Sequence, residues 1–446
     1  MTAPADSPVE PVLAAEPDAL EYLFGLERFG MKFGLDSIRT IVEALGRPDR
    51  AFRSLHIAGT NGKGSVTAML DAALRAAGIR SARYTSPHLV DLTERFVIDG
   101  RPVDRKALVG VVAELKRLIA ELVASGRLPA HPTFFEASTA AALELFRRAA
   151  VDVAVLEVGL GGRLDATNVV TPVVAAVTSI DFDHEKYLGH TLAAIAAEKA
   201  GIIKPAVPVV VGRMEAEPAA VIERIARERG APLVWAWDGV RVERVPCEPG
   251  APTVVRMRTP RRDYGEVALA LRGAHQIANA VVAVRVLEVF GDLGVVVPGA
   301  SIKAGLADVS WPGRLEYRRL PDGREAILDA AHNPAGAATL AAYLEETWPE
   351  KPPLVFAVMA DKDVRRMFEV LLPRVSSLVL TRSSTSRSAD PAALAAEARA
   401  VAPGLSVRIE PVRSQALAVA WQASRRIAVA GSIFLLGDIM RELEPA

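Results

Sequence analysis

The sequence reads SLHIAGTNGKGSVTAML between residues 54 and 70: a short apolar stretch, a glycine-rich turn and a helical pattern in direct succession. We predict a strand at Ser54–Ala58 and a helix at Lys63–Ala77. Backbone N–H groups in such a turn, with the positive end of the following helix, form a cradle for an anion. The standard phosphate loop has Ser or Thr directly after its lysine, whereas here a glycine separates Lys63 from Ser65. The turn therefore predicts a nucleotide site of a modified phosphate-loop type.

Further apolar stretches continue the pattern beyond this turn. They are rich in β-branched residues, and such runs favour strands buried on both faces of a parallel sheet. The expected strands are Ser81–Thr85, Val151–Val158, Val173–Ile180 and Val207–Val211, with Pro208 arguing for an edge position or a strand start. Between Pro232 and Leu271 the runs become shorter and Val alternates with Arg, which predicts a small antiparallel annex before a helix at Ala274–Phe290.

After Gly291 the alternation of strand and helix patterns begins again. The expected strands are Ala326–Leu328, Leu354–Val358, Ser377–Thr381, Ser406–Ile409 and Ser432–Leu436, and the expected helices are Ala335–Thr347, Pro391–Ala400 and Ser414–Ala428. The economical fold is α/β: an N-terminal P-loop ATPase-like parallel-sheet domain with the annex, and a smaller Rossmann-like C-terminal domain. We expect a disordered leader at 1–17, the ATP-binding domain at 18–296 and the second domain at 297–446.

Charge and cysteine content exclude several functional classes. The 446 residues carry 53 Lys and Arg against 53 Asp and Glu, so no strongly basic domain indicates a nucleic-acid partner. The single cysteine, Cys247, cannot form an internal disulfide or a Cys-based metal site, and it suits a reducing compartment. No apolar stretch is long enough to cross a membrane. We expect a cytoplasmic protein.

Candidate ligand residues follow two more of the expected strands. Ser86 supplies a hydroxyl oxygen, a hard ligand of the kind that Mg²⁺ prefers, although a Ser-Pro pair alone is more often only a turn. Glu157 ends the stretch Val151–Val158, at the edge where ligands of open α/β sheets bind. A carboxylate placed there costs several kcal/mol unless a cation meets it. The glycines that follow permit close approach to a phosphate or metal, unless they only turn the chain.

His184 and Lys199 extend the candidate site to the next segment. His184 is a candidate metal ligand, with Asp181 or Asp183 behind it, although a lone histidine is more often structural. Lys199 has small apolar neighbours, and desolvation there favours the neutral, reactive amine. The alternative is a solvated lysine paired with Glu198. Because the segments follow successive strands of one sheet, we expect them to converge on one nucleotide and metal site.

The chain resembles the folylpolyglutamate synthase/dihydrofolate synthase family of the Mur ligase superfamily. The resemblance covers nearly the whole chain, and its motifs occur in the family's order. They are GTNGKGS at 59–65, YTSPHL at 84–89, EVGLGGRLDATN at 157–168, DH at 183–184, EKAGIIK at 198–204, GAHQIANA at 273–280, WPGRLE at 311–316, DAAHNP at 329–334, MADKD at 359–363 and GSIFLLGD at 431–438, which resembles the family's last strand. One departure is Ala330, where the family usually has glycine.

The resemblance implies that ATP drives amide bond formation through an acyl phosphate. It implies a bifunctional enzyme, with dihydropteroate, reduced folates and L-glutamate as substrates, and a monomer. The implied catalytic residues are Lys63, Lys199 and His332. The implied nucleotide-binding residues are Gly59, Thr60, Asn61, Gly62, Lys63, Gly64 and Ser65 for the phosphates, with Asn279 for adenine, Arg314 for the phosphate tail and Asp329 for the ribose.

The resemblance also implies a metal site and a pteroate site. Two Mg²⁺ ions would be held by Ser86, Glu157, His184 and Lys199, the last as a carbamylated lysine. The pteroate residues would be Thr133, Phe135, Asp165 and Ala166, although Phe135 is equally well explained as core packing. His332 would stand where phosphate and glutamate meet.

Three alternatives remain open at this point. A folylpolyglutamate synthase without the dihydropteroate activity would have the same motifs. A cell-wall Mur ligase would have a nucleotide-sugar-binding domain before the phosphate loop, and only 58 residues precede Gly59. A non-catalytic nucleotide-binding protein would have no need for Glu157, His184 and Lys199 at separate strand ends. For a ligase we expect the domains to close on ATP, because Lys63 and His332 belong to different domains.

Overall fold

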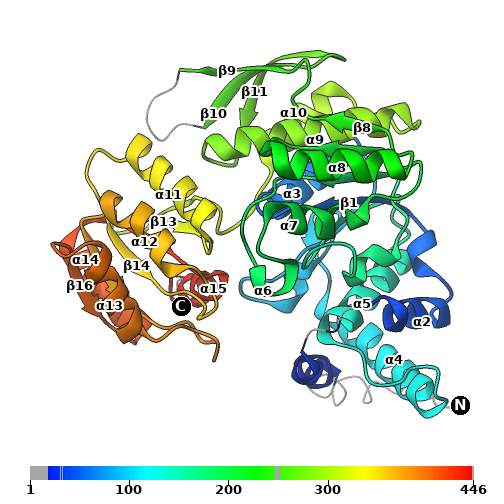
Figure 1. Cartoon of the computed structure of the whole chain (residues 1–446), viewed down its shortest axis with the longest axis horizontal. Coiled ribbons are helices and arrows are strands. Elements are labelled where there is room, and N and C mark those ends of the chain that lie inside the picture. Colours follow the sequence, from blue (N-terminus) through cyan, green and yellow to red (C-terminus); the bar gives the residue numbers. More distant parts are fainter. Residues whose placement is uncertain (1–18, 31, 33, 247–251, 444–446) are drawn as a thin grey trace, which may run out of the picture.

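A sheet of eight strands forms the core of the first part of the molecule (Figure 1). The computed structural model describes residues 19–30, 32, 34–246 and 252–443, so the expected leader and Cys247 lie outside the described residues. The strand order is β4-β3-β2-β5-β1-β6-β7-β8. β3 is antiparallel to both of its neighbours, and every other neighbouring pair is parallel. The strands are β1 (Arg53–Ala58), β2 (Ser81–Tyr84), β3 (Phe96–Ile98), β4 (Arg101–Pro102), β5 (Val153–Glu157), β6 (Val174–Val177), β7 (Val209–Val211) and β8 (Leu233–Trp235).

Helices cover both faces of this sheet, which explains its apolar strands. In β5, Val153 and Val155 pack in one core cluster with α3 and α9, while Ala154 and Leu156 pack in another with α4 and α5. The helices of this part are α2 (Asp36–Ala44), α3 (Lys63–Ala76), α4 (Arg105–Ala124), α5 (Phe134–Arg148), α6 (Glu185–Leu188), α7 (Leu192–Lys199), α8 (Ala216–Glu228), α9 (Ala274–Asp292) and α10 (Gly299–Asp308). Pro208 directly precedes β7, an interior strand, so the strand-start alternative holds.

The antiparallel annex is confirmed, with one adjustment. It consists of β9 (Arg241–Val245), β10 (Thr253–Arg258) and β11 (Asp263–Leu269), in the order β11-β10-β9. The alternation of Val and Arg in β10 matches alternating burial along that strand. The adjustment is that Leu233–Trp235, expected within the annex, instead pairs in parallel with β7 as an edge of the large sheet.

The second part of the chain forms a six-stranded sheet in the order β12-β13-β17-β14-β15-β16, in which only the edge strand β12 is antiparallel to its neighbour. Its strands are β12 (Glu316–Arg319), β13 (Glu325–Asp329), β14 (Pro353–Phe356), β15 (Ser377–Leu380), β16 (Ser406–Ile409) and β17 (Arg426–Ala430). Its helices are α11 (Pro334–Thr347), α12 (Val364–Leu371), α13 (Pro391–Val401), α14 (Arg413–Ala423) and α15 (Ile433–Leu443). The expected mixed α/β architecture with a second α/β sheet is confirmed.

The last strand was predicted in the wrong place. The stretch Ser432–Leu436 is not a strand but leads into α15, and the strand is β17, which begins within the last three residues of the expected helix Ser414–Ala428. Gly431, at φ +110°, ends the strand with a backbone that L side chains rarely adopt. The Ser432 hydroxyl then accepts a hydrogen bond from the backbone N–H of Phe434 and stabilises the helix start. An apolar run of this length fits a buried helix as well as a buried strand.

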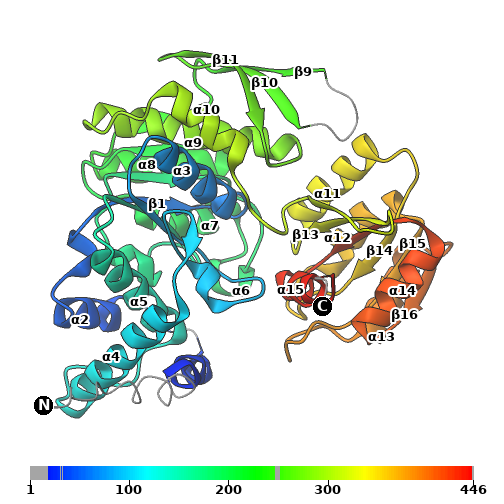
Figure 2. The same cartoon turned by 180° about the vertical axis from the view of Figure 1, so that it is seen from behind.

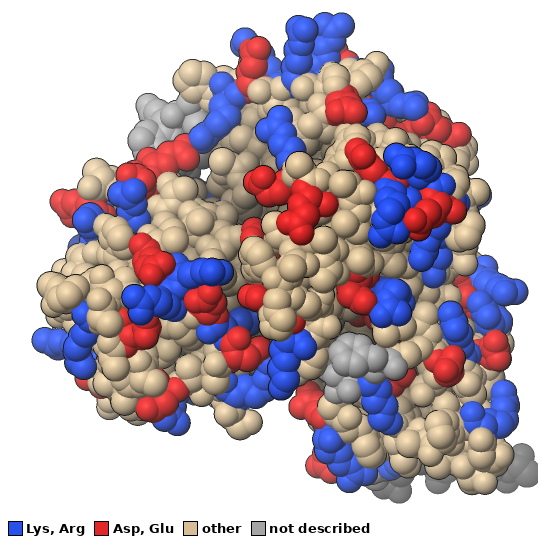
Figure 3. Space-filling model, viewed as in Figure 1, with Lys and Arg blue, Asp and Glu red and all other residues tan. Residues whose placement is uncertain are grey.

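The two large sheets lie side by side, and the annex extends above both (Figures 1 and 2). At the rim, Arg244 of β9 pairs with Glu346 of α11 at 2.5 Å. Between the sheets, α15 lies against the loop after β2: a Cβ atom at Gly437 would stand 1.8 Å from the carbonyl oxygen of Leu89, so only glycine permits this approach. Basic and acidic side chains are interspersed over the face seen in Figure 3, in keeping with a formal net charge of zero. Within the described ranges, no helix has both the length and the apolar character that crossing a membrane requires.

Candidate active site between the two sheets

A cavity of about 480 Å³ lies between the two sheets and is lined by residues of both. The residues that follow β2, β5, β1 and β6 reach it together because these four strands are neighbours in the parallel sheet. Of the residues singled out from the sequence, those lining the cavity are Gly59, Thr60, Asn61, Gly62, Lys63, Gly64, Ser65, Ser86, Glu157, Asp183, His184, Lys199, Asn279, Arg314, Asp329 and His332. Thr133, Phe135, Asp165 and Ala166 are not among the lining residues.

The glycine-rich turn is fastened to the end of β6. The Thr60 backbone N–H donates to the carbonyl oxygen of Ser179 at 2.7 Å, and the Asn61 N–H donates to the Ser179 hydroxyl at 3.1 Å. Gly59 has φ +148°, and a Cβ there would lie 1.9 Å from Oγ1 of Thr178, so the turn requires glycine. The Lys63 ammonium group donates to the carbonyl oxygens of Gly59 and Thr60 at 3.0 and 3.1 Å. The turn is thus pre-shaped, with the Lys63 side chain folded over it. Burial lowers the pKa of Lys63, and the negative charges of Glu157 and Asp183 oppose that fall.

Glu157, Ser86 and His184, the residues expected to hold Mg²⁺ together with Lys199, all line the cavity. Glu157 is buried, and its Oε2 accepts a hydrogen bond from the Ser86 backbone N–H at 3.1 Å. Burial raises the pKa of Glu157, while the positive charge of Lys63 opposes that rise. Burial lowers the pKa of His184 to about 4, against the pull of Asp183, so at neutral pH its imidazole is uncharged and has a lone pair to offer. In the described part of the chain no group of three or more His, Cys, Asp or Glu gathers as a metal site. Mg²⁺ prefers hard oxygen ligands and uses waters and substrate phosphates as further ligands, so the Glu157 carboxylate and the Ser86 hydroxyl are groups that could hold it.

Lys199 is a buried lysine at the end of α7. Its side-chain nitrogen donates to the carbonyl oxygen of Gly59 at 2.9 Å, and only 5% of the residue is exposed. Glu198 turns the other way and pairs with Arg163 at 2.8 Å, so the alternative of a solvated Glu198–Lys199 pair does not describe this structure. Burial, assisted by the positive charge of Lys63, lowers the pKa of Lys199 to about 7. Near neutral pH a substantial fraction of Lys199 is therefore an uncharged amine.

Helix α9 supplies a chain of amides to the phosphate turn. Asn279 Nδ2 donates to Gln276 Oε1 at 2.9 Å, and Gln276 Nε2 donates to the Ser65 hydroxyl at 3.2 Å. Asn279 also lies so close to the turn that a Cβ at Gly62 would stand 2.3 Å from its Oδ1. Gln276 was not singled out from the sequence, although it belongs to the GAHQIANA motif. Asn279, which is expected to contact adenine, is thus connected through Gln276 to Ser65, which is expected to hold the phosphates.

The second sheet contributes Asp329 and His332 at the end of β13. Asp329 is buried and accepts hydrogen bonds from the backbone N–H groups of Leu315 and Ala331, at 2.8 and 2.9 Å. Burial raises its pKa, and the charge of Arg314 opposes the rise. His332 Nδ1 lies 2.8 Å from the carbonyl oxygen of Ala330. A carbonyl can only accept, so Nδ1 carries a proton and Nε2 faces the cavity side.

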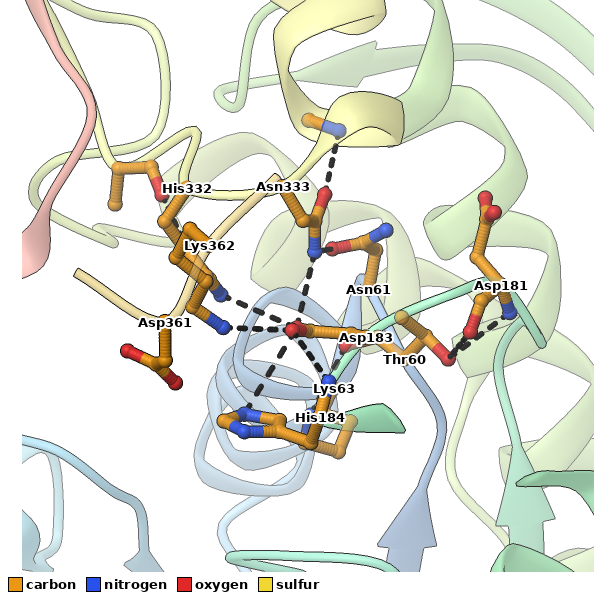
Figure 4. Close-up of polar contacts among 12 residues, drawn as sticks. Thr60, Asn61, Lys63, Asp181, Asp183, His184, His332, Asn333, Asp361 and Lys362 are labelled. Atoms are coloured by element: carbon orange, nitrogen blue, oxygen red, sulfur yellow. Dashed lines mark hydrogen bonds and ion pairs between the residues drawn. The ribbon is translucent and has the colours of Figure 1, made fainter. Parts of the chain in front are cut away.

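Asp183 connects the two sheets (Figure 4). Its carboxylate contacts Lys362 Nζ at 2.6 Å, Asn333 Nδ2 at 3.2 Å and His332 Nε2 at 3.5 Å, all from the second part of the chain. Burial alone would raise the pKa of Asp183, but the hydrogen bond from His332 and the charges of His332 and Lys362 hold it well below the usual range. Sequence reasoning placed Asp183 only behind a metal ligand and missed Asn333 and Lys362, although DAAHNP and MADKD contain them.

The expected pteroate residues lie at the start of α5 and at the short helix that begins at Ala166. The Thr133 and Glu136 side chains form a capping box at the start of α5. Asp165 is buried and accepts N–H bonds from Leu160 and Thr167, and Ala166 belongs to the core. The Phe135 ring lies against Gly159, where a Cβ would stand 2.5 Å from it. Of these four, Phe135 and Asp165 contact residues that line the cavity, Gly159 and Leu160 respectively.

Comparisons with known proteins agree with this arrangement. Residues 57–287 match the model of the Mur ligase middle domain, and residues 313–433 match that of the Mur ligase glutamate ligase domain. A dihydrofolate synthase/folylpolyglutamate synthase of Mycobacterium tuberculosis is 38% identical over 375 residues, which cover 81% of this chain and 76% of that protein. A probable bifunctional folylpolyglutamate synthase/dihydropteroate synthase of Haloferax volcanii is 39% identical over 387 residues, or 84% of this chain, and the match spans less than half, 44%, of that protein.

This chain belongs to the folylpolyglutamate synthase/dihydrofolate synthase family of Mur ligases. A folylpolyglutamate synthase structure from M. tuberculosis, complexed with ADP and AMPPCP, superposes with a TM-score of 0.89 at 34% identity and covers 98% of this chain and 99% of that one. A structure of E. coli FolC with DHPP and ADP gives a TM-score of 0.82 at 28% identity, with 98% and 99% covered. Like its relatives, this ligase is an ATP-dependent enzyme, and the roles that the resemblance gives to single residues stay predictions.

Proposed function

We propose that this ligase joins L-glutamate to dihydropteroate, forming dihydrofolate, and to the γ-carboxyl group of reduced folates, with ATP as the phosphoryl donor. One observation carries the proposal: Lys63, Glu157 and Lys199 from the first sheet and Asp329 and His332 from the second line one cavity. A nucleotide-binding protein without ligase chemistry has no use for buried acids, a buried lysine and a histidine around one phosphate turn. The names of the relatives, which include both activities, support the same function.

The reaction requires a carboxylate to become an acyl donor. A carboxylate oxygen of the pteroate or folate attacks the γ-phosphorus of ATP, the bond from this phosphorus to the β,γ-bridging oxygen breaks, and ADP leaves. The glutamate nitrogen then attacks the acyl carbon, inorganic phosphate leaves with the electron pair of the C–O bond, and the amine loses a proton. Because anions meet in both steps, catalysis depends on positioning and on neutralising charge. Lys63 over the phosphate turn supplies a fixed cation for this purpose.

Ser86, Glu157, His184 and a carbamylated Lys199 would hold two Mg²⁺ ions, which, when bound, neutralise the phosphate oxygens. Carbamylation suits the buried amine of Lys199: its nitrogen adds to CO₂ and loses a proton, so a cation becomes an oxygen donor. The pKa of about 7 that burial gives Lys199 makes the attacking neutral form available. Gly59, whose carbonyl oxygen now accepts from this nitrogen, keeps the group at the phosphate turn.

We further infer a monomer working in the cytoplasm. The cavity is built from one chain, so a second copy is not needed to complete it. The single cysteine of the sequence suits a reducing compartment. Light scattering on the purified protein tests the oligomeric state, and a mass near twice 47.5 kDa would contradict this part of the proposal.

Incubation of the purified protein with ATP, Mg²⁺ and glutamate tests the main proposal. Dihydropteroate and a tetrahydrofolate are supplied in separate reactions, and ADP and the intact masses of the products are measured. We expect glutamate-dependent ADP release with both substrates and products heavier by one glutamyl residue or more. Release with the tetrahydrofolate alone would leave a folylpolyglutamate synthase. Release with neither would refute the proposal.

A further inference from the structure

Polar contacts between the first and second parts of the chain gather on one carboxylate within the cavity (Figure 4). Asp183 follows β6, and its two carboxylate oxygens are contacted by side-chain nitrogens of Lys362, Asn333 and His332. The side chains of Asp183 and Lys362 are each only 9% exposed. Removing one partner of a buried pair leaves an uncompensated buried charge, which costs far more than breaking an ion pair at the surface.

The residues gathered by Asp183 are three of those that the second part of the chain brings to the cavity. His332 and Asn333 precede and cap α11, and Lys362 lies just before α12. All three line the cavity beside the phosphate turn. Asn333 Nδ2 also donates to Asn61 Oδ1 at 3.1 Å, so the start of α11 contacts the turn itself. The position of these groups relative to Lys63 is therefore set at Asp183 and Asn61.

Asp181, two residues earlier in the same loop, is an acid with hydrogen bonds inside the first part of the chain. Its carboxylate accepts a hydrogen bond from the backbone N–H of Phe182 at 3.0 Å, and the contacts of this residue with Thr60 go through its backbone. In Figure 4 it lies on the far side of Thr60 from the cluster around Asp183. Asp181 is thus a matched reference for Asp183.

We propose that Asp183 is a positioning residue for the ligation: on domain closure it draws Lys362, Asn333 and His332 into register with the phosphate turn. The inference rests on the proposed function, because the register matters only if chemistry takes place between the two sheets. It assigns Asp183 no contact with substrate. Its carboxylate instead aligns groups that themselves face the cavity, which a merely stabilising contact elsewhere in the interface would not do.

The test compares Asp183→Asn with Asp181→Asn in the full chain. Asparagine keeps the size of the side chain and its contact with Asn333 but removes the charge that holds Lys362. We expect kcat for glutamate ligation to fall about 100-fold in Asp183→Asn, since misplacing reacting groups by about 1 Å costs about that factor. The KM for glutamate should rise, while the Kd for an ATP analogue stays within about two-fold, because the phosphate turn is fastened by its own sheet. Asp181→Asn should keep all three constants within about two-fold.

Two further measurements separate positioning from loss of the fold. Small-angle scattering with an ATP analogue and dihydropteroate should show the compaction of the wild type and a smaller change in Asp183→Asn. Lys362→Met removes the same contact from the other side, so the double variant should be no slower than the slower single variant. If Asp183→Asn melts well below the wild type, Lys362→Met, alone and with Asp181→Asn, takes its place in the comparison.

The outcomes distinguish the inference from the function on which it rests. If the wild type shows no glutamate-dependent ADP release, the proposed function fails. If the wild type ligates glutamate and Asp183→Asn keeps kcat within about three-fold, or loses ATP-analogue affinity as much as kcat, the positioning function is refuted while the ligase remains.

Discussion

The two halves of the cavity are held in place by different means. On the first sheet, Lys63 and Lys199 donate to backbone carbonyls of the phosphate turn, and the turn is fastened to the next strand. On the second sheet, Lys362 and Asn333 reach across the gap to a side chain of the first. One half is assembled by its own sheet, whereas the other depends on how the two parts of the chain meet.

This difference indicates a division of labour. A turn fixed by its own backbone can bind a nucleotide before the domains close, since little has to move. Groups that face the second substrate come into register only in the closed arrangement, which protects an acyl phosphate from water. Nucleotide binding and ligation should therefore respond differently to substitutions in the two halves.

The largest effect is expected at the first half of the cavity. Lys199→Met should lower glutamate-dependent ADP formation by at least about 1,000-fold, because it removes a group that neutralises or ligates charge at the reacting phosphate. Lys204→Met is the matched control: Lys204 follows on the same segment but donates to the carbonyl oxygen of Asn168 instead of the phosphate turn. Measured ADP formation in Lys199→Met that equals the control would remove Lys199 from the chemistry.

The buried His56 should make the stability of the fold depend on pH. This histidine of β1 is fully buried, its Nε2 lies 2.8 Å from the Thr167 hydroxyl, and burial, assisted by the charge of Lys204, lowers its pKa to about 3. Below pH 6.5 the unfolded chain binds a proton at this histidine, whereas the folded chain does not. The free energy of unfolding therefore decreases as the pH is lowered from 6.5 to about 3, and the contribution of His56 is fully present above pH 6.5. From pH 6.5 to pH 5 this group costs about 2 kcal/mol.

Urea unfolding of His56→Asn tests this expectation. The variant should be less stable than the wild type near neutral pH, yet lose about 2 kcal/mol less between pH 6.5 and pH 5. His190→Asn is the control, since the His190 side chain is 80% exposed. If the free energies of unfolding of the wild type and His56→Asn changed equally with pH, the protonation of His56 would not be linked to folding, contrary to its burial.

A smaller and more selective effect is expected at Gly159, beside the predicted pteroate residues. Alanine there meets the ring of Phe135, and overpacking of this kind costs about 1–3 kcal/mol. We expect the KM for dihydropteroate to rise about 10-fold while the KM for ATP changes little, because the phosphate turn is fastened elsewhere. Gly110→Ala on α4, with nothing within 4 Å of its Cβ, should leave both constants unchanged. If both KM values rose equally, Phe135 would be explained by core packing and not by pteroate binding.

The sequence identified the first half of the cavity better than the second. In the parallel sheet, β5 and β6 flank β1, the strand that leads into the glycine turn. Their apolar sequences indicated buried parallel strands, so we could infer that the residues after these strands meet at one edge of the sheet. Ser86, Glu157, His184 and Lys199 reach one cavity for this reason.

The second half could not be derived in the same way. The roles of Lys362 and Asn333 depend on Asp183, which lies 179 and 150 residues away from them in the sequence, and no local period encodes such a separation. The strand β17 was missed because Arg426–Ala430 continues the small apolar residues of α14, so that propensity alone does not mark the boundary. The helix α15 was mistaken for a strand because its first turn is fully apolar, and only tertiary packing decides between the two.

The smallest effect is expected at the rim, where Arg244 and Glu346 also join the two parts of the chain. Both side chains are nearly half exposed, at 46% and 48%, so water screens the pair and its contribution is at most about 1 kcal/mol. Arg244→Gln should leave kcat and the scattering profile of the ligand-bound enzyme close to those of the wild type. The two bridges span the same gap, so what separates them is burial and contact with groups that line the cavity. A loss in Arg244→Gln as large as that in Asp183→Asn would show that closure as such, rather than alignment at Asp183, limits the reaction.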